Sequence, residues 1–267
     1  RSTLFPYTTL FRSLAERKVS EEINAIEGVD TLVTAFPEHG EPSIAAALKD
    51  LDRKKYSDVI VIPVFLSVSS HVFDDLPTII GKKENPATIE QMKLEGIERY
   101  VASAKTHLAK PLDFSDLLGS NVLGRARLLS TDPADEGIAL VGYGSTHFDD
   151  EWKELFEKTG DEVCRKGRFA SYTTAWCGHR AHYSPDSTTA AINRILTKKR
   201  RAIVIPLLVS VSKRFQLDII GTGVDNVGRN RSRIRYKPDA ILPDSCLETW
   251  IVETAAEHAA EIRNEKK

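Results

Sequence analysis

The chain of 267 residues is long enough for one large domain or two domains of ordinary size. Hydrophobic residues make up 41% and charged residues 28%, which is typical of a soluble globular protein. Its 37 basic and 38 acidic side chains nearly cancel, and no apolar run reaches the length of a membrane span. The sequence therefore argues against a nucleic-acid-binding protein and a transmembrane protein. Three scattered cysteines exclude a disulfide framework and suit a reducing compartment.

The first thirteen residues look foreign to the rest of the chain. They show no helical period and no cap, and they stop directly before a helical pattern. This stretch resembles the in-frame translation of a common short-read sequencing adapter, so we exclude residues 1–13 from fold reasoning; a natural disordered N-terminus is the alternative. With the adapter interpretation, the native start and the first strand of the protein are missing.

Strands and helices alternate along the remainder of the chain. Apolar periodicity predicts helices, and short β-rich apolar runs predict strands buried in a parallel sheet. The predicted helices cover residues 14–26, 43–51, 89–104, 114–129, 150–164, 187–196 and 245–262, and the predicted strands cover 31–36, 58–67, 137–143, 169–175 and 201–210.

The sequence also repeats itself. Ile60-Val61-Ile62-Pro63 recurs 143 residues later as Ile203-Val204-Ile205-Pro206, and the same offset pairs Ser67 with Ser210 and Asp75 with Asp218. An ordered series of matches favours duplication over chance similarity of strands. We therefore predict an α/β fold of two similar lobes with flavodoxin-like topology, residues 14–130 and 136–264, each a parallel sheet flanked by helices. Residues 130–135 would link them, and residues 82–108 have no clear counterpart.

Ligands of parallel α/β sheets bind beyond the carboxyl ends of the strands. Two such ends carry distinctive strings, Ala35-Phe36-Pro37-Glu38 and Val61-Ile62-Pro63-Val64-Phe65-Leu66-Ser67, and the second continues to His71-Val72 and Asp74-Asp75-Leu76-Pro77. On these motifs the chain resembles the sirohydrochlorin chelatases of the CbiX/SirB type, within the class II chelatases. Members of that family insert cobalt, iron or nickel into tetrapyrroles between two similar lobes, in the synthesis of cobalamin and sirohaem.

The resemblance assigns roles to particular residues. Glu38 matches the family's glutamate and His71 its third-strand histidine, so both are candidate catalytic residues and metal ligands. In the second lobe Tyr143 stands where the family's Gly-His-Gly-Ser motif has histidine, and Arg214 occupies the position equivalent to His71. Only the first lobe could therefore hold the usual metal set. Asp74 and Asp75 are better explained as acids in the first turn of a helix.

The chemistry of the candidate residues agrees with this assignment. Imidazole and carboxylate ligands with open positions suit Co²⁺ or Fe²⁺, and an imidazole can accept a pyrrole proton near neutral pH. The metal is a substrate, and no organic cofactor is implied. Lys213, Arg214 and Arg180 are candidate anchors for the carboxylates of the tetrapyrrole.

Other histidines and a cysteine offer weaker alternatives. Cys177, His179 and His182 lie within six residues and could bind a metal or form a structural loop, and His147 could substitute for the histidine that Tyr143 replaces. His107 and His258 lie in ordinary strand and helix contexts, and we assign them no role.

Two functions stay open at this level. One is metal insertion into sirohydrochlorin or a close relative; the other is a diverged protein that binds metal or tetrapyrrole without turnover. With its first strand missing, the chain is expected to be a weak or inactive chelatase. The resemblance implies a cytoplasmic protein, with an exported form left open by the missing N-terminus, and the sequence does not give the oligomeric state.

Overall fold

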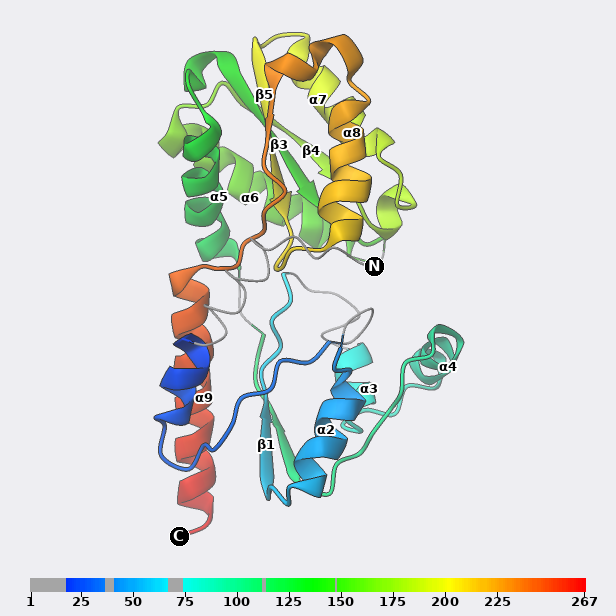
Figure 1. The fold of residues 1–267 in the computed structure, drawn as a ribbon, viewed down its shortest axis with the longest axis vertical. Helices are drawn as coiled ribbons and strands as arrows, with labels where there is room; N and C mark the ends of the chain where they lie inside the picture. The colour runs from blue at the N-terminus through cyan, green and yellow to red at the C-terminus, as the bar shows by residue number, and fades with distance from the viewer. Residues whose placement is uncertain (1–17, 37–40, 67–73, 112–113, 147) are drawn as a thin grey trace, which may run out of the picture. The chain divides into compact units, whose positions relative to one another are not determined.

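The computed structural model describes residues 18–36, 41–66, 74–111, 114–146 and 148–267. They form two compact units, which are described separately (Figure 1). Unit 1 comprises residues 1–112 and 245–267, and unit 2 comprises residues 113–244. Among the described residues, no helix is both long and apolar enough to cross a membrane.

Unit 2 contains a parallel sheet of four strands, β3 (Glu136–Gly142), β4 (Ser171–Trp176), β5 (Arg201–Leu207) and β6 (Ile234–Tyr236). Their order is β4-β3-β5-β6, with every pair parallel, as in the first four strands of a flavodoxin-like sheet. The central strand β3 is buried along its whole length, which explains its continuous apolar sequence. The predicted fold class is therefore confirmed.

Helices cover both faces of this sheet. Helices α5 (Ser115–Leu129) and α6 (Asp149–Gly167) lie on one face, and α7 (Asp186–Leu196) and α8 (Thr222–Asp225) lie on the other (Figure 1). Between β5 and α8 the chain forms a π-helical segment, Lys213–Gly221, and a short 3₁₀ segment, Gly228–Arg233, precedes β6. Both faces are thus shielded from water, and ligands have access at the ends of the strands.

Unit 1 holds a smaller parallel pair, β1 (Asp58–Val61) with β2 (Lys105–Leu108). One apolar cluster packs Val59 and Val61 against α2 (Ile44–Arg53), α3 (Leu76–Ile79) and α4 (Pro86–Glu95). A second cluster joins Ile62 to the helix of residues 18–24 and to α9 (Ser245–Glu265). Helix α2 begins as predicted at Ser43, whose hydroxyl accepts a hydrogen bond from the N–H of Ala46 at 3.2 Å.

The internal repeat is visible in the strand pairing. Val59 faces Thr106 in unit 1, and Ala202, its counterpart 143 residues later, faces Ile234 in unit 2. The offset therefore falls from 143 to 128 between these strands, so the first copy holds 15 additional residues. Helix α4 lies in this stretch and accounts for the part of residues 82–108 that has no counterpart, whereas β2 at its end corresponds to β6.

Several predictions differ from the structure. Residues 31–35 form no ladder, and Phe36 makes only an isolated bridge to Ser43, so the strand predicted at 31–36 is wrong. Thr34-Ala35-Phe36 corresponds to Thr174-Ala175-Trp176 of β4, which pairs with β3 alone. At that offset of 140 the counterpart of β3 falls before residue 3, outside the described residues. Residues 31–36 therefore have no described neighbour with which to form a sheet.

The remaining differences concern boundaries. Strand β1 ends at Val61, short of the predicted residue 67; residues 62–64 pair with no described strand, whereas their counterparts at the end of β5 pair with β3. The helix predicted at 89–104 spans Pro86–Glu95 and stops at Gly96, whose φ of 70° is left-handed. The compact units also divide elsewhere than the predicted lobes of residues 14–130 and 136–264: α5 belongs to unit 2 and α9 to unit 1.

An ionic cluster fixes the end of unit 1 where β1 begins. The Asp58 carboxylate, 14% exposed, accepts hydrogen bonds from Lys266 Nζ at 2.6 Å and from the Ser57 hydroxyl at 2.7 Å, and it pairs with His107 Nε2 at 2.9 Å. The hydrogen bond from Lys266 is the largest of the effects that hold the pKa of Asp58 far below its usual range. His107 therefore has a structural explanation.

We expect Asp58→Asn to lower the free energy of unfolding by about 1–3 kcal/mol at neutral pH, because the hydrogen bonds to its charged carboxylate weaken. A lowered pKa stabilises the folded state at pH values above the unfolded pKa of about 4, and this contribution is lost as the pH falls towards the folded pKa. Denaturant unfolding should therefore show a difference from wild type that shrinks below about pH 4. Asp50→Asn, at a more exposed acid on α2, should change stability less at every pH.

Candidate functional site

Three residues of the predicted site, Glu38, His71 and His147, lie outside the described residues. Close to His71 in sequence, Asp74 is bonded to Lys83 Nζ at 2.5 Å, and this bond lowers the pKa of its carboxyl group. Asp74 is thus already paired, and it precedes α3, which has no acidic residue in its first turn, so the predicted role of Asp74 as a first-turn acid is wrong. The described part of the chain contains no group of three or more His, Cys, Asp or Glu side chains that could hold a metal ion.

The carboxyl end of the unit 2 sheet brings four rings together, which we call the aromatic cluster: Tyr143, His179, Tyr183 and Phe215. Tyr143 directly follows β3, His179 and Tyr183 lie in the loop after β4, and Phe215 lies in the π-helical segment after β5. The centroid of the Tyr143 ring is 5.5 Å from that of His179 and 5.4 Å from that of Phe215. Loops from three adjacent strands thus form one surface where α/β proteins bind ligands.

A hydrogen-bonded chain runs through this cluster. The hydroxyl oxygens of Tyr143 and Tyr183 are 3.2 Å apart, and the Tyr183 hydroxyl lies 3.2 Å from the ring nitrogens of His179. The two tyrosines are half-buried, whereas His179 is exposed. The cluster therefore presents both apolar ring surface and polar groups towards solvent.

Two glycines permit this arrangement. Gly144 has a φ of 78°, which turns the chain sharply after Tyr143. A Cβ atom at Gly178 would lie 2.7 Å from the backbone oxygen of Tyr143, so only glycine allows the two loops to approach this closely. The Gly-Tyr-Gly-Ser motif thus positions a tyrosine at the place where the related motif carries histidine.

The three predicted anchors differ in their availability. The guanidinium of Arg214 lies 4.4 Å from the centroid of the Tyr183 ring, is exposed, and makes no ion pair with a described residue. Lys213 Nζ is 3.2 Å from Asp218, and Arg180 pairs with Asp149 while lying over the Trp176 ring. Arg214 is therefore the cation with most freedom to bind an external carboxylate.

The geometry gives little support to a metal site formed by Cys177, His179 and His182. Cys177 is fully buried in the apolar core, and this burial raises the pKa of its thiol to about 12. Metals bind the thiolate form, so Cys177 is better explained as a core residue. His182 is exposed, with a left-handed φ of 48°, and His179 belongs to the aromatic cluster.

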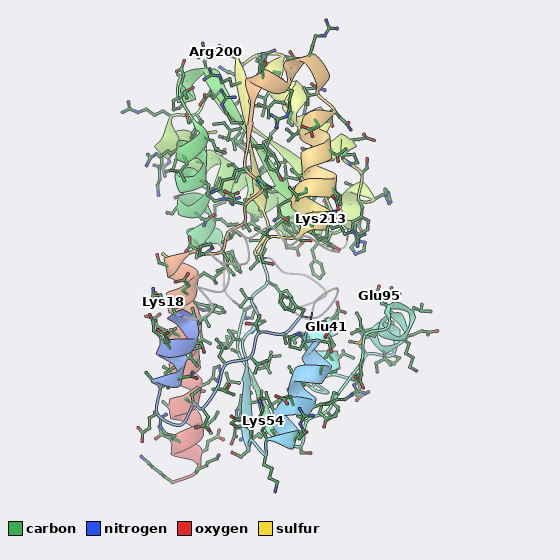
Figure 2. The ribbon with its side chains drawn as sticks, in the orientation of Figure 1. Lys18, Glu41, Lys54, Glu95, Arg200 and Lys213 are labelled. Carbon is green, nitrogen blue, oxygen red and sulfur yellow. The ribbon has the colours of Figure 1, made fainter. Side chains whose placement is uncertain are left out.

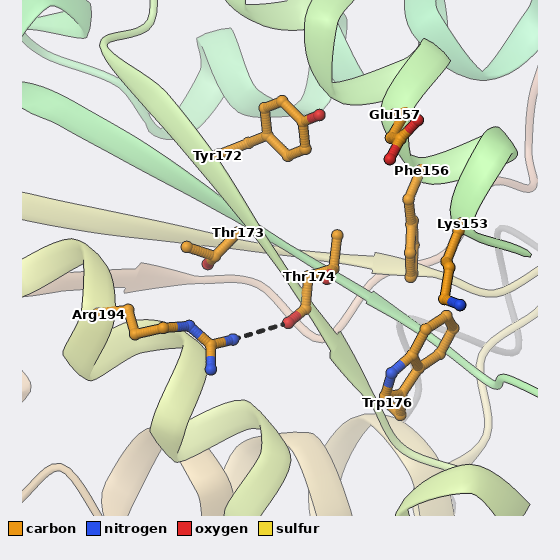
Figure 3. Close-up of a pocket in the computed structure, with 8 residues that line it drawn as sticks. All are labelled: Lys153, Phe156, Glu157, Tyr172, Thr173, Thr174, Trp176 and Arg194. Atoms are coloured by element: carbon orange, nitrogen blue, oxygen red, sulfur yellow. Dashed lines mark hydrogen bonds between the residues drawn. The ribbon is translucent and has the colours of Figure 1, made fainter.

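A separate hollow of about 390 Å³ lies beside the edge strand β4 (Figure 3). It is lined by Thr173, Thr174 and Trp176 of the strand, with side chains of α6 and α7 on either side. Arg194 Nη2 donates to the Thr174 oxygen at 3.1 Å, and Lys153 pairs with Asp149 at 2.8 Å. Because these cations already have partners, the aromatic cluster is the stronger ligand candidate.

Sequence reasoning singled out His179, Arg214 and Tyr143 but missed Tyr183 and Phe215. Both are aromatic residues in loops that follow predicted strands, and this position was the available signal. Their distance along the chain, and the π-helical geometry that brings Phe215 to Tyr143, could not be inferred from local pattern alone.

Comparison with known proteins gives independent information. A model of the CbiX family matches residues 10–127. A sirohydrochlorin cobaltochelatase from Methanococcoides burtonii is 34% identical over 92 residues, which are 34% of this chain and 65% of that relative. The match thus covers slightly less than two thirds of the relative's length, and it falls short of half of this chain.

Solved structures show the same fold. SirB from Bacillus subtilis with Fe³⁺ has a TM-score of 0.63 and 13% identity, with 98% of this chain and 94% of that chain covered. The sirohydrochlorin chelatase SirB from Bacillus subtilis subspecies spizizenii in complex with cobalt has a TM-score of 0.59 and 12% identity, with 99% and 94% covered. Residues 10–127 thus resemble the CbiX family in sequence, and nearly the whole chain shares the fold of the SirB structures, in agreement with the resemblance suggested by its motifs.

Proposed function

We propose that this chain inserts a divalent metal ion, Co²⁺ or Fe²⁺, into sirohydrochlorin or a closely related tetrapyrrole. The observation that carries the proposal is that the CbiX segment, residues 10–127, contains both Glu38 and His71. The curated relative is named for cobalt insertion into sirohydrochlorin, and the SirB structures contain Fe³⁺ or cobalt. These names support a chelatase reaction in the synthesis of cobalamin or sirohaem.

In this proposal, His71 and Glu38 bind the ion before its transfer. An imidazole and a carboxylate leave several coordination positions open, so the ion can pass to the four nitrogens of the macrocycle. Insertion of one divalent ion releases two protons from the pyrrole N–H groups. A histidine with an ordinary pKa near 6.5 accepts one of them at neutral pH, and water takes the other.

The aromatic cluster and Arg214 contribute substrate binding. A tetrapyrrole is a flat ring with several carboxylates, so aromatic ring surface next to a guanidinium matches both its shape and its charge. Lys213 and Arg180 would add positive charge, although each already has an acidic partner in unit 2. The tyrosine at position 143 provides ring surface here in place of a metal ligand.

We expect Arg214→Gln to weaken binding of metal-free sirohydrochlorin about tenfold, since one charge-assisted hydrogen bond to a carboxylate is lost. Absorption titration of the macrocycle at moderate salt measures this affinity. Lys213→Gln is the matched control and should change the affinity less, because Asp218 lies 3.2 Å from the ammonium group. Equal losses in both variants would show that only net charge matters and that Arg214 has no specific contact.

The proposed reaction is tested by mixing the chain with sirohydrochlorin and Co²⁺ and following the absorption spectrum of the macrocycle. We expect conversion to the metallated spectrum faster than in a control without protein, and a parallel assay with Fe²⁺ ranks the two metals. A rate equal to the protein-free control in both assays, in a chain that binds the macrocycle, would instead identify a binding protein.

That second candidate, a protein that binds a metal or tetrapyrrole without turnover, is favoured by one structural observation. Residues 31–36, which are separated from Glu38 by one residue, form no ladder with a described neighbour. Within the described part of the chain, the segment before Glu38 thus has no strand beside it like the one that supports β4 in unit 2. Loss of turnover with retained tetrapyrrole binding would be the signature of this candidate.

A further inference from the structure

Unit 2 carries a concentration of positive charge that the proposed function does not use. Residues 197–201 and 228–237 together contain nine lysines and arginines and no acidic residue. The chain as a whole has 37 basic and 38 acidic side chains. About a quarter of its cations therefore lie in these fifteen residues, which we call the basic patch.

The fold brings the two segments together. Strands β5 and β6 pair with Ala202 opposite Ile234, which places the residues before each strand side by side. The Arg233 guanidinium then fixes the junction, because it donates to the carbonyl oxygens of Arg200 at 2.9 Å, Lys199 at 2.8 Å and Leu196 at 3.2 Å. The two segments of the basic patch are thus held together by strand pairing and by the hydrogen bonds of Arg233.

Most of this patch, residues 197–201 and 228–233, lies at or before the starts of β5 and β6, at the amino ends of the strands. Figure 2 shows Arg200 at one end of unit 2 and Lys213, which precedes Arg214 and Phe215, at the opposite end. Binding at the basic patch would therefore leave the carboxyl end of the sheet accessible. The two surfaces can be occupied at the same time.

Internal ion pairs neutralise only part of the charge. Arg231 Nε lies 2.9 Å from Asp225, and Arg200 lies 3.8 Å from Asp132 and 3.7 Å from Asp135. In contrast, Lys198, Lys199 and Arg229 make no ion pair with any described residue, and Lys198 and Arg229 are exposed. At least three cations are thus available to an external anion.

We propose that the basic patch binds an acidic surface of a partner protein. The carboxylates of Asp132, Asp135 and Asp225 stand among the cations, where they would repel a continuous phosphate backbone, whereas the separate carboxylates of a protein surface can reach the unpaired cations. Tyr236 lies in the patch, but its hydroxyl donates to the Gln216 oxygen and its ring is half-buried, so no exposed ring offers base stacking. Ile234 is buried, so it gives no apolar anchor for a lipid surface.

The test uses the full chain and three probes: a glutamate-rich peptide, an oligouridylate of equal charge, and vesicles containing phosphatidylglycerol. The variant K198E/K199E/R229E reverses the unpaired charges. The variant K55E/K82E/K93E changes net charge equally at exposed lysines of unit 1 and is the matched control. A neutral variant, K198Q/K199Q/R229Q, covers the case in which charge reversal impairs folding, and circular dichroism verifies all three.

We expect the peptide to bind the wild-type chain more tightly than the other probes, and the patch variant to lose at least about tenfold in affinity while the control changes little. Binding should also weaken as salt rises. Tighter binding of oligouridylate or of vesicles would overturn the proposal in favour of a nucleic acid or membrane partner. Equal losses in patch and control variants, or no binding of the peptide at low salt, would also overturn it.

Discussion

Replacing His71 by alanine is expected to reduce the rate of metal insertion about 100-fold, which corresponds to about 2.7 kcal/mol of transition-state stabilisation. The reason is that the imidazole is proposed to bind the ion and to accept a pyrrole proton, and alanine does neither. The affinity of the protein for Co²⁺, measured by calorimetry, should fall about tenfold with it, since one of two proposed ligands is removed. Affinity for metal-free sirohydrochlorin should stay unchanged.

His258→Ala is the matched control for this variant. His258 lies on α9 and pairs with Glu261 at 3.2 Å, so it is a histidine with a surface role in unit 1. Its loss should leave metal affinity and turnover at the wild-type level. Glu38→Gln should resemble His71→Ala in metal affinity. A His71→Ala variant with wild-type Co²⁺ affinity and wild-type turnover would remove His71 from the mechanism and leave only the relationship in sequence and fold.

Local sequence pattern was sufficient for the elements of unit 2. The apolar runs that became β3 and β5 are buried on both faces, so their composition alone indicates strands in a covered parallel sheet. The short strand β6 was not predicted, because Ile234-Arg235-Tyr236 is too brief and too polar to resemble a buried strand. It forms because β5 offers a neighbouring edge, and this is information that lies more than 25 residues away in the chain.

Residues 31–36 also show that a strand depends on its neighbours, because here a predicted strand did not form. Their composition favours a strand as strongly as that of β4, but strands need neighbours, and no described residue pairs with them in a ladder. Helix boundaries were predicted where a cap residue fixes them, as at Ser43. The compact unit to which each helix belongs was not predicted. An amphipathic stripe indicates that one face of a helix is buried, but it does not indicate against which sheet.

The candidate site was predictable to the extent that it rests on motifs. Tyr143 and Arg214 were singled out by their equivalence to family positions, and the structure places Arg214 over Tyr183 and Tyr143 beside it. Cys177 could not be assigned from sequence, because a cysteine beside two histidines can be either a ligand or a core residue. Its burial in the apolar core decides between them.

The largest effect on stability is expected for replacement of Arg125, on helix α5. Arg125, 10% exposed, donates from Nε to Asp239 at 3.2 Å and from Nη1 to the carbonyl oxygen of Pro206 at 2.9 Å. Replacement by methionine keeps much of the apolar stem but leaves the Asp239 carboxylate and that carbonyl without their donor. We expect Arg125→Met to lower the free energy of unfolding of unit 2 by about 3 kcal/mol, the cost of removing one partner of a mostly buried pair.

The unfolding of unit 2 can be observed through Trp152 and Trp176, which pack on one another with ring centroids 5.8 Å apart. The third tryptophan, Trp250, lies on α9 in unit 1, so a Trp250→Phe background separates the signals. Arg127→Met on the same helix is the matched control; it removes an exposed side chain and should cost less than about 0.5 kcal/mol. If Arg125→Met left the Trp152 and Trp176 transition in place, α5 would not be part of the cooperative core of unit 2, and the predicted lobe boundary at residue 130 would describe the folding unit better than the division at residue 113.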